Sequence, residues 1–147
     1  MKNILIALDL SATDSHLLNY ASLMAEKFGS KLWLVHIAAP DPDFVGYGTG
    51  PIYIRDSRAK ELKEEHQQLM HIMDDLNARS LHAEALLIQG PTVEMLELEV
   101  KKLGIDLLII GSHRHGFFYE TFVGHTSARL LKHLSIPVMI IPLKDEA

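Results

Sequence analysis

The sequence predicts an α/β fold built on one parallel sheet of five strands, with helices on both faces. Short apolar runs alternate four times with segments of helical periodicity, and the chain finishes on a further apolar run. Glycine or proline marks most of the junctions between these segments. In a doubly wound sheet of this kind, ligands bind at the carboxyl ends of the strands, where the strand order reverses.

The first strand is predicted over residues 3–8 and is followed by Asp9. Ser11 followed by Asp14 resembles a capping box, so we expect a helix after a two-residue loop, ending at Gly29. The apolar face of this helix recurs at helical spacing and comprises Leu17, Leu18, Ala21, Met24, Ala25 and Phe28. A second strand is predicted over residues 32–37.

The middle of the chain changes character. Residues 38–56 are dense in proline and glycine and have no sustained period, which predicts a long loop that could act as a lid. Residues 57–78 then form the most polar helix, which is expected to lie outside the sheet. Its single apolar stripe comprises Leu62, His66, Leu69, Met73 and Leu76.

The second half repeats the alternation. Residues 82–89 alternate partly between apolar and polar side chains, as expected of an edge strand. Gly90 and Pro91 start a helix that Gly104 ends. A buried fourth strand, a fourth helix and a last strand follow, over residues 106–111, 124–135 and 137–143.

Composition restricts the class of protein. The 147 residues fit one domain, residues 1–147, and 14 Lys and Arg against 19 Asp and Glu leave no basic surface for nucleic acid. The absence of cysteine excludes disulfides and thiolate chemistry. No apolar run approaches a membrane span or a secretory signal, so we expect a cytoplasmic protein that does not bind membranes.

Residues 106–127 carry the strongest functional signal. A buried strand leads into a polar loop with three glycines, Gly111, Gly116 and Gly124, and the loop leads into a helix. A strand end and a helix N-terminus together present free N–H groups to an anion, most often a phosphate. Ordinary turn chemistry explains glycines at such positions equally well.

Asp9 is the main candidate outside that loop. A carboxylate at the carboxyl edge of a sheet can accept a hydrogen bond from a ribose hydroxyl or an amine, or face a Mg²⁺ ion, and the alternative is a solvated acid before a helix. If the first and fourth strands are neighbours, Asp9 and Gly111 face one crevice.

Several other chemistries find no support in the sequence. Four histidines, His113, His115, His125 and His133, have no i, i+4 ligand spacing, so no metal site is predicted. Neither a G-x-S-x-G elbow nor a G-x-x-x-x-G-K-[ST] loop is present, and no catalytic residue is assigned. His36 and His66 are expected to be structural.

The chain resembles the universal stress protein family over nearly its whole length. The matching segments are KNILIALDLS at the start, LVHI, LGIDLLIIGSHRHG, Gly124 and the closing SIPVMIIPL. Nucleotide-binding members of that family show G-x-x-G-x9-G-[ST] after the fourth strand. Gly111 and Gly124 match the first and third glycines, whereas Arg114 replaces the second and His125 stands where Ser or Thr is usual.

The resemblance implies a Rossmann-like sheet, of the adenine nucleotide alpha hydrolase-like type, in the order 3-2-1-4-5. It also implies a homodimer and ATP or AMP, with Mg²⁺ as a companion ion, between the ends of strands one and four. Asp9 would meet the ribose or adenine, Ile37 the adenine through its backbone, and the glycines the phosphates. The implied nucleotide-binding residues are Ala7, Leu8, Asp9, Ile37, Gly111, Ser112, His113, Arg114, His115, Gly116, Gly124, His125, Thr126 and Ser127.

The two departures from the motif act in opposite directions. An arginine that must adopt a positive φ strains the loop, whereas a guanidinium near phosphate adds a charge-assisted hydrogen bond. Thr126 and Ser127 could supply the hydroxyl that His125 lacks. The first reading is therefore a stress-response or signalling module that binds an adenine nucleotide with little or no hydrolysis.

Two further readings stay open. The same pocket could belong to a slow ATPase or an adenylyl-transfer enzyme that uses a histidine of residues 113–125. Alternatively, the protein could be a dimeric interaction protein that binds no nucleotide. Dimerisation is expected in each reading because the last strand is an apolar sheet edge that a symmetric copy would cover, through Val138, Met139, Ile140 and Ile141.

Overall fold

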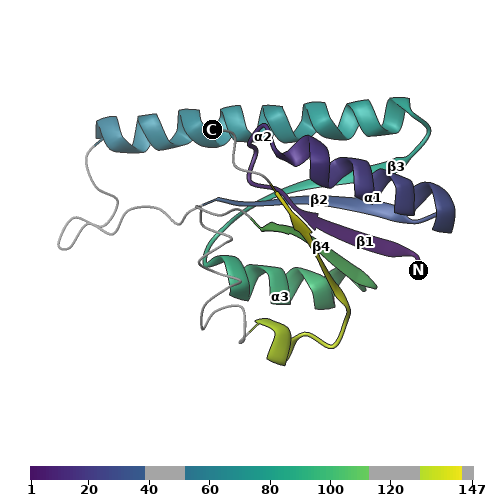
Figure 1. Cartoon of the computed structure of the whole chain (residues 1–147). Helices are drawn as coiled ribbons and strands as arrows, with labels where there is room; N and C mark the ends of the chain where they lie inside the picture. Colours follow the sequence, from purple (N-terminus) through teal and green to yellow (C-terminus); the bar gives the residue numbers. More distant parts are fainter. Residues whose placement is uncertain (39–51, 113–129, 144–147) are drawn as a thin grey trace.

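The structure of the protein, a computed structural model, describes residues 1–38, 52–112 and 130–143 (Figure 1). Residues 130–133 are helical, and the Leu134 N–H donates to the Leu130 carbonyl oxygen at 2.9 Å. The other elements, in chain order, are β1 (Asn3–Ala7), α1 (Asp14–Phe28), β2 (Lys31–Ala38), α2 (Ile52–Ala78), β3 (His82–Gln89), α3 (Thr92–Leu103), β4 (Leu107–Ser112) and β5 (Val138–Pro142).

The strands form one five-stranded sheet in the order β3-β2-β1-β4-β5, and every neighbouring pair is parallel. This confirms the fold class that the sequence predicted and the strand order that the family resemblance implied. The order reverses between β1 and β4, which are adjacent although more than a hundred residues separate them. The two strands that were predicted to flank the ligand crevice, the first and the fourth, are therefore adjacent.

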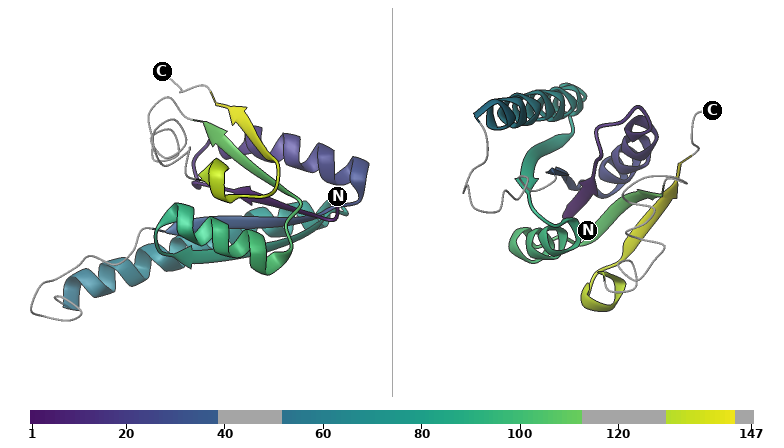
Figure 2. Two further views of the ribbon diagram at one scale, coloured as in Figure 1. Left: turned by 90° about the horizontal axis from the view of Figure 1, so that it is seen from below. Right: turned by 90° about the vertical axis from the view of Figure 1, so that its left-hand side faces the viewer.

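The helices cover the sheet on both sides, as expected. Helices α1 and α2 lie on one face, and α3 and residues 130–133 lie on the other (Figures 1 and 2). Alternate residues of β1 serve the two layers: Ile4 and Ile6 pack with α1 and α2, whereas Leu5 and Ala7 pack with α3. A central strand of a parallel sheet is covered on both faces, so its side chains must be apolar on both faces.

Several predicted boundaries were wrong. Helix α2 begins at Ile52, inside the segment predicted as a loop over residues 38–56, and Ala38 belongs to β2. Gly111 and Ser112 continue β4 instead of leaving it, because they pair in register with Ile141 and Pro142 of β5. Of the helix predicted over residues 124–135, the part before residue 130 lies outside the described residues.

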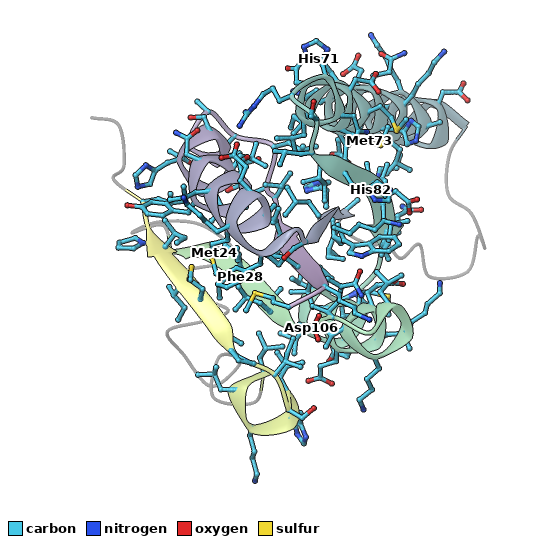
Figure 3. The ribbon with its side chains drawn as sticks, turned by 90° about the vertical axis from the view of Figure 1, so that its right-hand side faces the viewer. Met24, Phe28, His71, Met73, His82 and Asp106 are labelled. Atoms are coloured by element: carbon cyan, nitrogen blue, oxygen red, sulfur yellow. The ribbon has the colours of Figure 1, made fainter. Side chains whose placement is uncertain are left out.

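The apolar stripe predicted for α2 is only partly buried. Leu69 and Leu76 are buried, whereas His66 is exposed. A helix of 27 residues is about 40 Å long, and its first turns extend beyond the sheet (Figure 2). Phe28 of α1, predicted to be buried, is also exposed at the helix end (Figure 3).

Asp106, immediately before β4, links the amino ends of β1 and β4 (Figure 3). Its carboxylate accepts the Lys2 and Asn3 backbone N–H groups at 2.7 and 2.9 Å, and its own N–H donates to the Asn3 carbonyl oxygen at 2.8 Å. The two N–H groups, that of Asn3 first, lower the pKa of Asp106. These bonds fix the start of β4 against the start of β1.

None of the described helices combines the length and apolar character needed to cross a bilayer.

Candidate functional site

The carboxyl ends of β1, β2 and β4 lie along one edge of the sheet because all three strands are parallel neighbours. This edge brings together six of the predicted site residues: Ala7, Leu8, Asp9, Ile37, Gly111 and Ser112. Ala7 and Leu8 are buried, so it is their backbone that belongs to the edge. The other predicted site residues lie outside the described residues: His113, Arg114, His115, Gly116, Gly124, His125, Thr126 and Ser127.

Gly111 has a packing reason to be glycine. A Cβ atom at this position would overlap Leu143 Cδ1 and stand 3.2 Å from Leu143 Cγ. Gly111 is not one of the glycines with positive φ, so backbone conformation is not the reason for its identity. Close approach to Leu143 accounts for this glycine with or without a ligand.

The turn after β1 differs from the predicted capping box. Helix α1 starts at Asp14, with residues 8–13 as the connection, and its N-cap Thr13 makes no side-chain capping bond. The Asp14 carboxyl instead accepts the Leu10 N–H at 2.8 Å and faces the Asp9 N–H at 3.5 Å. The acid therefore binds backbone N–H groups of the preceding turn, as the second partner of a capping box does.

Asp9 is held in the same turn. Its Oδ1 accepts the Ser11 N–H at 3.0 Å, which closes a local turn typical of aspartate. Leu10, between the two acids, has φ +62°, a left-handed conformation that leucine rarely adopts. The direction in which Asp9 presents its carboxylate is thus fixed by bonds on both sides of Leu10.

The pKa of Asp14 is strongly raised. Burial first, then a side-chain hydrogen bond with Asp9 and the charge of Asp9, raise the pKa of Asp14 to about 8, although the Leu10 and Asp9 N–H groups act to lower it. At neutral pH Asp14 is therefore protonated and can donate a hydrogen bond to Asp9. The sequence pattern marks Asp14 only as a capping residue and gives no sign of its bond to Asp9.

His36 connects the end of β1 to α2. Its Nδ1 lies 2.8 Å from the Leu8 carbonyl oxygen, which can only accept, so Nδ1 donates. Its Nε2 lies 3.6 Å from Glu65 Oε2. These contacts support the sequence-based expectation of a structural role for His36.

A cavity of about 320 Å³ opens beside the turn, between it and α2. Its wall consists of Leu10, Ser11, Ala12, Asp14, Gln68, His71 and Ile72. His71 lies on the outer part of α2 (Figure 3), with its Nε2 at 3.7 Å from Asp75 Oδ2. Among residues 1–38, 52–112 and 130–143, no three acidic or histidine side chains are grouped as metal ligands would be.

Comparison with known proteins identifies the family. The sequence model of the universal stress protein family matches residues 1–142. The chain belongs to the universal stress protein family. The resemblance inferred from the sequence segments is thereby confirmed.

Three members of the universal stress protein family match this chain over nearly the whole length of both proteins. A universal stress protein A homolog from Haemophilus ducreyi is 32% identical, over 99% of each chain. Universal stress protein UspA from Lactobacillus plantarum superposes with a TM-score of 0.77 at 17% identity, covering 95% of this chain and 97% of that one. A universal stress protein from Archaeoglobus fulgidus in complex with dAMP has a TM-score of 0.65 at 15% identity, over 96% and 98%. At these identities the two solved structures show the shared fold.

Proposed function

We propose that this universal stress protein is a stress-response or signalling module that binds an adenine nucleotide, ATP or AMP, where β1 and β4 end. The observation that carries the proposal is the strand order: β1 and β4 are neighbours at the reversal point, with Asp9 following one and Gly111 near the end of the other. The dAMP complex of the Archaeoglobus fulgidus relative supports the choice of ligand.

The chemistry of the edge suits a nucleoside. A carboxylate is the acceptor that ribose hydroxyls need, and the bond from the Ser11 N–H to Asp9 Oδ1 fixes where the Asp9 carboxylate lies. Ile37 supplies backbone groups near the end of β2, and its side chain packs with the apolar layer beneath. Gly111 and residues 112–127 would hold the phosphates, with Mg²⁺ as their companion in the case of ATP.

The same proposal assigns little or no hydrolysis, since the described residues at this edge include no acid or base committed to activating water at a terminal phosphate. The proposal further places the protein in the cytoplasm and assigns it a homodimeric state. Strand β5 is an edge of the sheet, and Ile140 on it is 45% exposed, so pairing with a symmetric copy would cover an apolar edge.

Equilibrium titration of the purified protein with ATP, ADP and AMP tests the proposal. Asp9→Asn keeps the shape of the side chain and removes its charge, and it should weaken binding by about tenfold or more, as expected for a lost charge-assisted bond. Asp74→Asn, an exposed acid on α2, is the matched control and should leave the affinity unchanged. Absence of binding at millimolar nucleotide would leave the dimeric interaction protein as the better reading. Release of ADP or pyrophosphate in steady-state turnover would instead favour the enzyme.

A further inference from the structure

Asp14 is an acid in a place where an acid is costly. It is 4% exposed, at the start of α1, and its contacts are the Leu10 and Asp9 N–H groups and the Asp9 side chain. A buried ionised carboxylate beside another carboxylate is strongly disfavoured, whereas a protonated one can donate to that neighbour. The hydrogen bonds of Asp14 to the Leu10 N–H and to the Asp9 side chain offset this cost, and they show what the acid does for the turn.

The first thing it does is hold Leu10. A leucine with φ +62° persists only where its surroundings determine the conformation. The bond from the Leu10 N–H to Asp14 Oδ2, at 2.8 Å, is the contact that satisfies that strained peptide. Without it the chain leaving β1 would relax, and Asp9, the preceding residue, would turn with it.

The second thing it does is hold the Asp9 side chain. The two side chains are hydrogen-bonded to each other, and the protonated Asp14 is the donor of that bond. Asp9 also accepts the Ser11 N–H at 3.0 Å, so its orientation has two independent supports.

We propose that Asp14 is the positioning residue of the nucleotide site: through the Leu10 N–H and a hydrogen bond donated to Asp9, it orients the Asp9 carboxylate for the ribose. This inference rests on the proposed function and adds to it a specific residue and a dependence on proton binding. Asp14 is 4% exposed, so it would act through Leu10 and Asp9 and not through its own contact with the nucleotide.

The titratable neighbours of Asp14 are few among the described residues. Asp9 faces it from the same turn, and α2 brings His71 to the wall of the shared cavity. The other α2 residues of that wall are Gln68 and Ile72, which do not titrate. The cavity lets water reach the acid from the α2 side, so its proton can exchange without unfolding.

The decisive variants are Asp14→Asn and Asp14→Ala. Asparagine accepts the Leu10 N–H through Oδ1 and donates to Asp9 through Nδ2, so it reproduces the protonated acid. Alanine does neither. Ser15→Ala is the matched control, because the Ser15 hydroxyl donates to the Ala12 carbonyl oxygen in the same helix turn.

Binding is measured with adenosine, which has no phosphates for the histidines of residues 113–125 to contact. Near pH 7, Asp14→Asn and Ser15→Ala should bind within about threefold of the wild type, and Asp14→Ala should bind about tenfold or more weakly. Above about pH 8 the wild type should lose affinity as Asp14 ionises, while Asp14→Asn should not. If Asp14→Asn binds as weakly as Asp14→Ala, or the wild type is independent of pH between about 6 and 9, the inference is wrong.

A second measurement does not need a ligand. The Leu10 amide should exchange slowly with solvent in the wild type and in Asp14→Asn, and rapidly in Asp14→Ala. Slow exchange in all three would overturn the inference. Should the wild type bind no adenosine while Leu10 exchange follows this pattern, the nucleotide function fails and the positioning of the turn by Asp14 stands. Asp14→Asn and the pH profile suffice if Asp14→Ala does not fold.

Discussion

The buried acid at the start of α1 makes folding of this protein depend on one proton. The ordinary pKa of an aspartate is 3.8, and burial raises that of Asp14 to about 8. Between these two pH values the folded protein binds a proton at Asp14 that the unfolded chain does not bind. Stability contributed by the protonated acid is therefore complete below about pH 4 and is lost as pH rises toward 8.

The size of this effect follows from the interval. Each pH unit within it removes about 1.4 kcal/mol from the free energy of unfolding, so the full interval amounts to about 6 kcal/mol. Asp14→Asn cannot ionise and lacks this slope, while every other titratable group is shared by the two proteins. From pH 5 to pH 8, the stability of the wild type should therefore fall relative to Asp14→Asn by about 4 kcal/mol.

Urea unfolding followed by circular dichroism at pH 5, 6, 7 and 8 measures this difference directly. A stable domain has about 5–15 kcal/mol in total, so a change of this size moves the urea midpoint well beyond error. Stability curves of wild type and Asp14→Asn that run parallel across this range would refute the reasoning, since Asp14 would then be ionised in both folded and unfolded chains.

Three further outcomes are expected. Gly111→Ala should cost about 1–3 kcal/mol in urea unfolding by overlapping Leu143, and Leu143→Ala in the same chain should make the added methyl tolerable; additive losses would contradict this. Asn77→Ala removes two bonds to the Ala83 backbone, at 2.8 and 3.1 Å, and should cost about 1–2 kcal/mol, seen as a lower midpoint in thermal melts. Ile140→Lys should convert a dimer to a monomer by light scattering, and a monomeric wild type would remove the proposed interface.

The elements of this fold were readable from the sequence because their patterns are local. Glycines at the ends of α1 and α3 adopt left-handed conformations, and their N–H groups close the helices onto Ala25, Val100 and Lys101. The strand order had a different origin, since no local pattern says that β1 lies beside β4. It came from the family resemblance, and the register of the sheet confirms it.

The candidate site was readable only in part. Asp9 stands at a strand end, which is a position that sequence reveals, but its bond to Asp14 depends on Leu10 adopting a left-handed turn. Ser11 and Asp14 matched a familiar capping pattern, and the structure uses the acid on the preceding backbone instead. The contact that explains Gly111 comes from Leu143, the residue directly after β5, and nothing near Gly111 in the sequence indicates it.

The pairing of β1 with β4 has a consequence for synthesis. As the nascent chain leaves the ribosome, β1 can pair with β2 at once, but its other edge must wait for a partner near residue 107. Until then one edge of β1, a strand that is apolar on both faces, has unpaired backbone groups, and such an edge is prone to aggregate with other chains. The Asp106 carboxylate accepts the Lys2 and Asn3 backbone N–H groups, so it is well placed to align β4 with β1 and to shorten the time for which the edge of β1 is unpaired.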